Sequence, residues 1–241
     1  MSDLDSKESV IEHKKIIREK PLLRQTYFDY YHQFKSVKVP KGNLVEIGSG
    51  GGFLKDIIPS VITSDVVKGP GIDKVFSANK MPFKKNSVSA FFMLNVLHHI
   101  KNPERALKEM ERCLKYNGKI IMIESYNSPW SRFIYHNFHH EDFDPKASWK
   151  IKGKGRLSSA NGALPWIIFV RDKNIFQKKF QSLKIKKVAP HTPLAYLLSG
   201  GLSKPQLLPS FTYLMIKSTE KILSPFNKWL AMFVTIVLEK K

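Results

Sequence analysis

Residues 44–54 read Leu-Val-Glu-Ile-Gly-Ser-Gly-Gly-Gly-Phe-Leu, which is a short apolar run followed by a glycine-rich turn and the start of a helix. The run Leu44–Ile47 has the composition of a buried strand. Glycine permits a positive φ and lets a ligand approach the backbone closely. The N-terminus of the following helix offers unpaired N–H groups to an anionic group. Because such loops also bind dinucleotides, this segment predicts a ligand loop but leaves the ligand open.

Strand and helix patterns alternate after this loop, which predicts a parallel sheet with right-handed crossovers. We therefore expect an α/β fold: a Rossmann-like, seven-stranded, mostly parallel sheet with helices on both faces. A helical N-terminus and a lid insertion complete it. Further strands are expected at Val61–Val66, Ser87–Leu94, Lys119–Glu124, Ile167–Val170, Lys184–Val188 and Trp229–Leu238. Helices are expected at Phe53–Ile58, Pro103–Lys115 (capped by Asn117-Gly118) and Asn174–Phe180.

The chain divides into four predicted segments, at the points where this rhythm begins and ends. Residues 1–41 hold two amphipathic helices, and Pro40-Lys41-Gly42 breaks the pattern. Residues 42–126 form the cofactor-binding core, and residues 127–182 an insertion over the acceptor site. Residues 183–241 complete the sheet and contain an apolar helical insertion.

The composition restricts the classes of partner and compartment. The 241 residues carry 40 Lys and Arg against 20 Asp and Glu, a net charge of +20. This excess favours anionic partners such as phospholipid headgroups, nucleic acid or phosphorylated substrates, although a lysine-rich solvated surface would have the same composition. The single cysteine, Cys113, excludes a disulfide framework within the chain, so we expect a cytoplasmic location. The sequence has no stretch of 18 apolar residues, so we expect no helix that spans a membrane.

Four further motifs narrow the ligand. Asp65 ends the second strand, and Met81-Pro82-Phe83 precedes the third. Asn95-Val96-Leu97-His98-His99 follows that strand, and the segment from Arg105 to Gly118 leads into the next one. In this order and spacing, residues 44–124 resemble the class I S-adenosylmethionine-dependent methyltransferases, in particular the small-molecule and lipid group of the methyltransferase type 11 kind.

The resemblance implies S-adenosyl-L-methionine as cofactor and S-adenosyl-L-homocysteine as product. Glu46 would meet the amino group of the methionine part, and Asp65 would bind the ribose diol. The Asp that the family has before Ala78 is Ser77 here, so the contact to adenine would be weaker or made partly by Asn79. The cofactor-binding set that the resemblance implies is Glu46, Gly48, Ser49, Gly50, Gly52, Asp65, Val66, Ala78, Asn79, Asn95, Val96 and Leu97.

A histidine-rich segment follows the strand that ends at Glu124, at the edge where ligands bind in this architecture. His139 or His140 with Glu141 or Asp142 would form a catalytic base and its orienting partner. The alternative is a lid whose histidines are structural. His136, His139 and His140 have the spacing of metal ligands, but no second cluster supports them, so we expect no metal.

Acceptor-binding residues are sought around the same edge. In the family, the position of His98 and His99 borders the methyl pocket, which predicts a wall of that pocket. Arg156 and Arg171 bracket a polar loop suited to an anionic or sugar-like acceptor. His191 lies in a rigid Pro-His-Thr-Pro turn, where a structural role competes with an acceptor contact.

The second half of the chain interleaves aromatic residues with lysines, notably over Leu194–Trp229. These side chains suit either ordinary core packing or peripheral binding to the inner face of a membrane. We expect methyl transfer to an O or N atom of a small-molecule, lipid-linked or glycan-linked acceptor. The alternatives are an RNA methyltransferase, or a non-catalytic cofactor-binding module that docks on membranes or partners. The oligomeric state is open.

Overall fold

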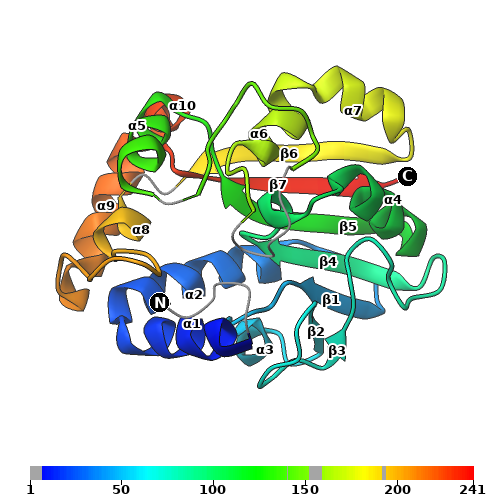
Figure 1. Cartoon of the computed structure of the whole chain (residues 1–241), viewed down its shortest axis with the longest axis horizontal. Coiled ribbons are helices and arrows are strands. Elements are labelled where there is room, and N and C mark those ends of the chain that lie inside the picture. Colours follow the sequence, from blue (N-terminus) through cyan, green and yellow to red (C-terminus); the bar gives the residue numbers. More distant parts are fainter. Residues whose placement is uncertain (1–6, 140, 152–158, 192–193) are drawn as a thin grey trace.

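The computed structural model describes residues 7–139, 141–151, 159–191 and 194–241, and its centre is one seven-stranded sheet (Figure 1). The strand order is β3-β2-β1-β4-β5-β7-β6. All neighbours from β3 to β5 are parallel, and β7 runs antiparallel to both β5 and β6. The predicted fold class is therefore confirmed. The strands are β1 Asn43–Ile47, β2 Val61–Asp65, β3 Lys74–Val75, β4 Val88–Leu94, β5 Leu114–Ser125, β6 Leu183–His191 and β7 Phe233–Lys240.

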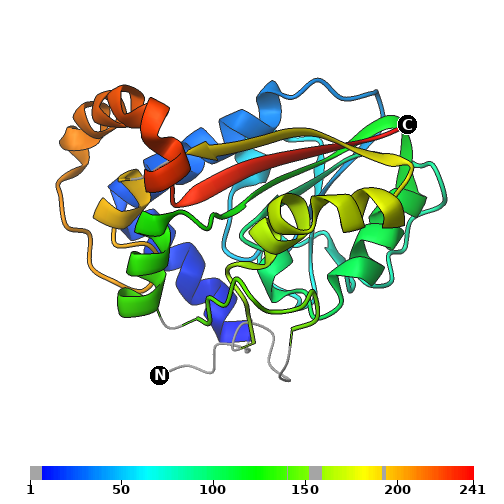
Figure 2. The ribbon, with the colours of Figure 1, turned by 90° about the horizontal axis from the view of Figure 1, so that it is seen from above.

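Helices cover both faces of the sheet, as Figure 2 shows from above. One face packs against α1 Lys7–Glu19, α2 Pro21–Ser36, α3 Leu54–Ile57 and α5 Pro129–Phe138. The other face packs against α4 Pro103–Cys113, α6 Leu164–Trp166, the π-helical turn η2 Ile167–Arg171 and α7 Lys173–Lys179. The remaining helical elements are η1 Leu97–His99, α8 Ala195–Leu198, η3 Ser210–Thr212, α9 Tyr213–Leu223, η4 Ser224–Phe226 and α10 Asn227–Leu230.

Three local predictions were wrong. The stretch Ile167–Val170 forms the π-helical turn rather than a strand. Ile168 and Phe169 of this turn pack into the core on one face of the sheet. The helix α4 ends at Cys113, and Asn117-Gly118 lies within β5 instead of capping the helix. Asn117 has a φ of 60° in that irregular part of the β4–β5 pairing, where a register shift occurs. Trp229 belongs to α10, so the last strand starts at Phe233.

The carboxyl ends of the parallel strands define where a ligand can bind. In Figure 1 these ends lie toward the left, where α5, α8, α9 and α10 also gather. Crossover connections leave a crevice outside the carboxyl ends of the strands in open α/β sheets. Because β7 is antiparallel, the chain ends at the opposite edge.

Candidate functional site

A cavity of about 1010 Å³ opens at the carboxyl edge of the sheet. Its walls come from the ends of β1, β2, β4 and β5, from α1 and α2, and from the segments around residues 141–143 and 196–203. The cofactor set implied by the resemblance meets here with one exception. Glu46, Gly48, Ser49, Gly50, Gly52, Asp65, Val66, Ala78, Asn79, Asn95 and Val96 all line the cavity.

The glycine loop takes the backbone shape that its sequence predicts. Gly48 has a φ of +67° and Gly50 a φ of +48°, which favour glycine. A Cβ on Gly48 would lie 2.7 Å from the side chain of Val96, so no other residue fits without movement. The loop is held to β2 because the Ser49 N–H donates to the Ser64 carbonyl (2.9 Å) and the Ser64 N–H donates to Ser49 Oγ (3.1 Å).

Glu46 is a buried acidic residue of the cavity wall that a bound ligand would stabilise. Its side chain is buried, and its Oε2 has no hydrogen-bond partner in the described part of the chain. Burial raises the pKa of Glu46 to about 7, and the nearby Asp65 charge adds to this, while a hydrogen bond with Ser49 opposes it. A buried acceptor without a partner costs about 1–3 kcal/mol, more if charged. An ammonium group in the cavity would satisfy this oxygen.

Asp65 stabilises the loop as well as lining the cavity. Its Oδ2 accepts the Gly50 N–H at 3.0 Å, and its Oδ1 accepts the Val66 N–H at 2.7 Å. Its Oδ1 also accepts the Val67 N–H at 3.2 Å, so the carboxylate that the resemblance assigns to the ribose also holds three backbone N–H groups at this edge of the sheet.

The residues that the resemblance implies for adenine, Ser77, Ala78 and Asn79, also line the cavity. Ser77 Oγ accepts the Asn79 N–H at 3.2 Å, and Ala78 is buried. Asn79 Oδ1 is buried and has no partner among the described residues. An amide oxygen accepts a hydrogen bond from an amino group such as adenine N6. This arrangement supports the expectation that Asn79 replaces part of the contact missing at Ser77.

The turn after β4 is fixed by a buried carboxylate from the end of β5. Glu124 Oε1 accepts the N–H groups of Val96 (2.9 Å) and Leu97 (2.7 Å). Asn95 has a φ of 55°, a conformation that Asn tolerates better than most residues. The prediction for Leu97 is corrected here, because its side chain is fully buried in the core and is not among the residues that line the cavity.

His98 lies between two carboxylates. Its Nδ1 is 2.6 Å from Glu124 Oε2, and its Nε2 is 3.5 Å from Glu141 Oε2. Burial alone would lower the pKa of His98, but the two carboxylates outweigh it and raise the pKa to about 10. Burial would raise the pKa of Glu141, but His98 and His99 lower it to about 2. His98 is therefore an imidazolium and Glu141 a carboxylate at neutral pH.

His99 completes this cluster, with its Nε2 3.8 Å from Glu141 Oε1 and its ring 4.2 Å from that of His98. One ligand atom each from His98, His99 and Glu141 lies within 4.8 Å of the others, so this set could hold a metal ion. A metal would have to displace the proton from His98 Nε2, which both carboxylates stabilise. The ion pairs with Glu141 already use one nitrogen of each histidine, and the absence of a metal stays a prediction.

The predicted base and orienter are only partly brought together. His139 lines the cavity, and its Nδ1 accepts the Glu141 N–H at 3.2 Å. The carboxylate of Glu141 reaches His98 and His99, which the sequence had assigned to the pocket wall. His140 lies outside the described residues, and so does Arg156.

Two acceptor predictions are corrected, because neither side chain lies along the cavity. Arg171 forms an ion pair with Asp172 and donates to the carbonyls of Pro145 and Ala147. These hydrogen bonds stabilise the loop around residues 145–147. His191 is partly buried and packs against Tyr30, with its Nε2 2.8 Å from Thr235 Oγ1. Burial lowers the pKa of His191 to about 3, so this histidine is neutral and structural.

The sequence did not assign the N-terminal helices to the site. Helix α1 contributes to the cavity wall, and a Cβ on Gly51 would overlap the backbone nitrogen of Lys14. The aromatic run over Thr26–Phe34 was the available signal, since two of its tyrosines line the cavity. The aromatic and aliphatic wall includes Ile17, Tyr27, Tyr31, Tyr135, Phe143, Tyr196, Leu202 and Phe233.

Comparison with known proteins agrees with this geometry. Residues 45–122 match the family model described as a methyltransferase domain. This segment is a class I methyltransferase domain. An uncharacterized protein of Methanocaldococcus jannaschii is 30% identical over 103 residues, covering 39% of this chain and 50% of that protein. The chain thus spans about half the length of that curated relative.

Solved structures share the fold over nearly the whole chain. A SAM-dependent methyltransferase from Thermotoga maritima has a TM-score of 0.58 at 19% identity, covering 97% of this chain and 99% of its own. The geranyl diphosphate C-methyltransferase of Streptomyces coelicolor has a TM-score of 0.52 at 15% identity, covering 100% and 86%. A methyltransferase of Haloferax volcanii, in complex with the Trm112 activator, has a TM-score of 0.55 at 11% identity, covering 99% and 97%.

The residues present fit S-adenosylmethionine, the cofactor that the resemblance implies. Two acceptor oxygens of cavity-lining residues, Glu46 Oε2 and Asn79 Oδ1, have no partner among the described residues. The glycines of the loop and the Asp65 carboxylate line the same cavity. These groups match the ammonium, the adenine amino group and the ribose hydroxyls of S-adenosylmethionine.

Proposed function

We propose that this protein transfers the methyl group of S-adenosylmethionine to an oxygen or nitrogen atom of a small, lipid-linked or glycan-linked acceptor. The observation that carries the proposal is a single cavity. It joins the buried Glu46 carboxylate, whose Oε2 has no partner in the described ranges, to the His98–His99–Glu141 cluster. A cofactor bound by the first group would lie beside the second. We also propose a cytoplasmic location, because the one cysteine is buried and free.

Methyl transfer from a sulfonium is an in-line displacement, so alignment and exclusion of water provide most of the rate enhancement. Glu46, Asp65 and the glycine loop orient the donor. Bound S-adenosylmethionine supplies an electrophilic methyl group. The aromatic wall orients the acceptor and keeps water away from it.

The proton of the acceptor needs a base only if the acceptor is a hydroxyl or a protonated amine. We assign this role to His99, because it lines the cavity and its Nε2 lies 3.8 Å from Glu141. The Glu141 carboxylate would stabilise the imidazolium that forms. His139 is the second candidate base, since it also lines the cavity next to Glu141.

Variants at these positions separate the roles. We expect His99→Ala and Glu141→Gln to lower kcat by about 10²–10⁴-fold while leaving the affinity for S-adenosylhomocysteine unchanged. His139→Ala is the matched comparison, and a larger loss there than in His99→Ala would move the base to His139. We expect EDTA to have no effect on the rate, and loss of activity restored by one added metal would instead make the cluster a metal site.

The acceptor class is tested by fractionation. Radiolabelled S-adenosylmethionine and the protein are incubated with lipid, small-molecule and RNA fractions of a cell extract. We expect label in the lipid or small-molecule fraction, which the Glu141→Gln variant should not produce. Label in RNA alone would support the RNA methyltransferase alternative. Cofactor binding without transfer to any fraction would support the non-catalytic module.

A further inference from the structure

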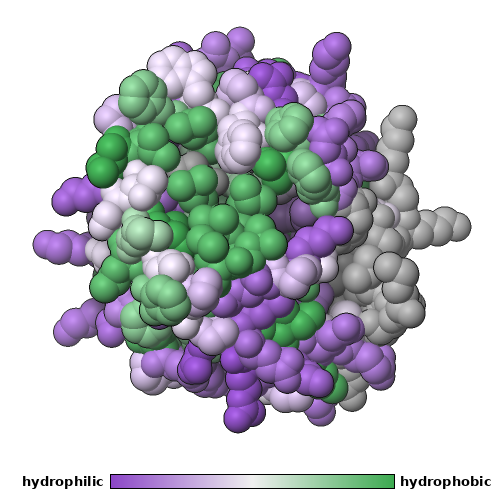
Figure 3. Space-filling view, turned by 90° about the vertical axis from the view of Figure 1, so that its left-hand side faces the viewer, coloured by the Kyte–Doolittle hydropathy of each residue, from purple (hydrophilic) through white to green (hydrophobic). Residues whose placement is uncertain are grey.

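The face of the molecule at the carboxyl edge of the sheet carries a group of large apolar side chains that are more than half exposed. Figure 3 shows this face, where apolar residues gather over the helical elements at the left of Figure 1. They come from α5, from the segment before η3, and from the elements between η3 and α10. We call them the edge patch: Phe133, Phe138, Leu207, Phe211, Leu214, Met215, Ile222, Phe226 and Trp229.

Helix α9 presents its apolar residues outward. Leu214 is 77% exposed and Ile222 is 75% exposed, while Ile216 and Glu220 on the opposite face are buried. A helix on a protein surrounded only by water normally has the reverse arrangement. The exposed side chains therefore indicate that an apolar environment other than water covers this side of the molecule.

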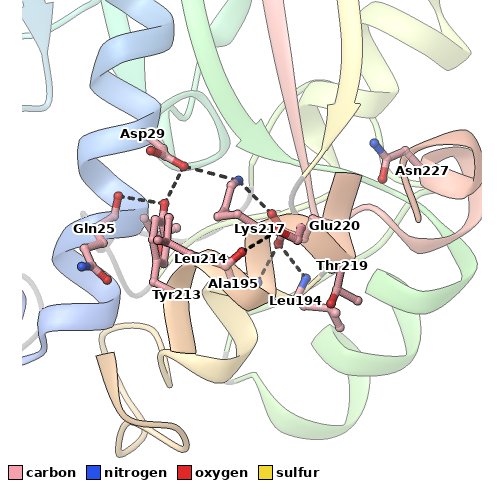
Figure 4. A network of polar contacts seen from close by, with 12 residues as sticks. Gln25, Asp29, Leu194, Ala195, Tyr213, Leu214, Lys217, Thr219, Glu220 and Asn227 are labelled. Atoms are coloured by element: carbon pink, nitrogen blue, oxygen red, sulfur yellow. Dashed lines mark hydrogen bonds and ion pairs between the residues drawn. The ribbon is translucent and has the colours of Figure 1, made fainter. Parts of the chain in front are cut away.

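The inner face of α9 is fixed by polar contacts, which Figure 4 shows. Lys217 Nζ lies 2.8 Å from Glu220 Oε2 and 3.3 Å from Asp29 Oδ2 of α2. Glu220 Oε1 accepts the N–H groups of Leu194 (3.1 Å) and Ala195 (2.7 Å), and Tyr213 donates to Asp29. The network holds the helix in this orientation, so its apolar residues cannot turn inward without breaking these partly buried ion pairs.

The charge around the edge patch is positive. Residues 194–232 contain four lysines and one acidic residue, Glu220, which is buried and paired with Lys217. Lys204, Lys221 and Lys228 are exposed, and so is Arg132 on α5. Exposed apolar side chains with cationic side chains among them are typical of segments that lie in the interface of an anionic bilayer.

Two segments of the chain contribute both to the edge patch and to the wall of the cavity. Helix α5 supplies Tyr135 to the cavity wall and Phe133 and Phe138 to the patch. The segment that leads into α9 likewise supplies Leu202 and Ser203 to the wall. An acceptor held in a bilayer beneath the patch would therefore have a short path to the cavity.

We propose that the edge patch docks the protein on the surface of a membrane that contains anionic phospholipid. No helix in the described ranges is long and apolar enough to span a bilayer. The aromatic and aliphatic side chains enter the boundary between headgroups and acyl chains, and the lysines contact the headgroup phosphates. Delivery of a lipid-linked acceptor by this docking rests on the proposed methyl transfer, whereas the docking itself does not.

The test is flotation of the full chain with vesicles of equimolar phosphatidylglycerol and phosphatidylcholine, and with vesicles of phosphatidylcholine alone. We expect binding to the anionic vesicles that weakens as salt is added, because salt screens the headgroup contacts. The triple variant Leu214→Ser, Met215→Ser, Ile222→Ser should bind at least about tenfold more weakly. The double variant Lys221→Glu, Lys228→Glu should also bind about tenfold more weakly.

The matched control is Tyr116→Ser with Ile175→Ser, two exposed apolar residues away from the edge patch, and it should bind as the parent does. Absence of vesicle binding, or equal binding by the triple variant and the parent, would overturn the proposal. Dimerisation without lipid that the triple variant abolishes would assign the patch to a second copy of the chain. If the parent and the triple variant bound RNA equally well, the positive charge of this face would be assigned to nucleic-acid binding rather than to phospholipid headgroups. Calorimetry with S-adenosylhomocysteine on every variant keeps a failure of docking distinct from a failure of the methyltransferase site.

Discussion

Glu46 links the pH dependence of stability to that of cofactor binding. Burial raises its pKa from an ordinary 4.5 to about 7, and this difference corresponds to about 3 kcal/mol. Because the native state holds the proton more tightly than the unfolded state, the contribution is fully present below pH 4.5. It is lost as the pH rises through 7. The protein without cofactor should therefore be less stable at pH 8 than at pH 5 by up to about 3 kcal/mol from this group.

The variant Glu46→Gln separates this effect from other titrating groups. Urea unfolding at pH 5 and pH 8 should show a smaller loss of stability in the variant, because its amide does not ionise. The surface substitution Glu19→Gln, on a residue that is 60% exposed, is the control and should behave as the parent does.

Cofactor binding should show the opposite sign. The ammonium group of S-adenosylhomocysteine needs the ionised carboxylate, so affinity measured by calorimetry should rise about tenfold per pH unit below pH 7 and then level off. Glu46→Gln should remove this dependence and weaken binding at pH 8 by about 10–100-fold, as loss of a charged hydrogen bond does. An unchanged pH dependence in the variant would refute the assignment of Glu46 to the ammonium group.

Three further variants test the architecture of the site. Gly48→Ala should lower stability by about 1–3 kcal/mol in thermal unfolding, and adding Val96→Ala should recover only the part due to the 2.7 Å contact, because the φ of +67° remains. Asp65→Asn should lower cofactor affinity at least about tenfold in calorimetry, since its amide would face the Gly50 N–H; an unchanged affinity would contradict its role toward the ribose. Glu124→Gln should destabilise the fold by about 3 kcal/mol and lower the pKa of His98 in an NMR titration, and a His98 that still titrates near pH 10 would assign its charge to Glu141 alone.

The sequence predicted what depends on local pattern. The strand before Gly48, the acid at Asp65 and the turn at Asn95 each follow from spacing along the chain, and their meeting at one sheet edge follows from parallel topology. Errors arose where tertiary packing overrides local preference. The apolar stretch Ile167–Val170 suits a strand or a buried helix equally, and only its packing on the sheet decides between them.

The partners of Glu141 could not be predicted, because they depend on the path of a loop through space. Its neighbour in sequence, His139, was the predicted partner, yet the fold brings His98 and His99 to it from η1, the turn after β4. The same limit applies to Arg171, whose charge is used by the adjacent Asp172. Periodicity reports which face of an element is apolar but does not specify such pairings.

The close contact between α1 and the glycine loop has a practical consequence for expression of the protein. Because the backbone of Lys14 lies against Gly51, helix α1 forms part of the cavity wall, and a shortened chain that begins after α1 would lose that part of the wall. The last strand ends at the opposite edge of the sheet. A tag after Lys241 would therefore leave both the pocket and the edge patch unobstructed for binding assays.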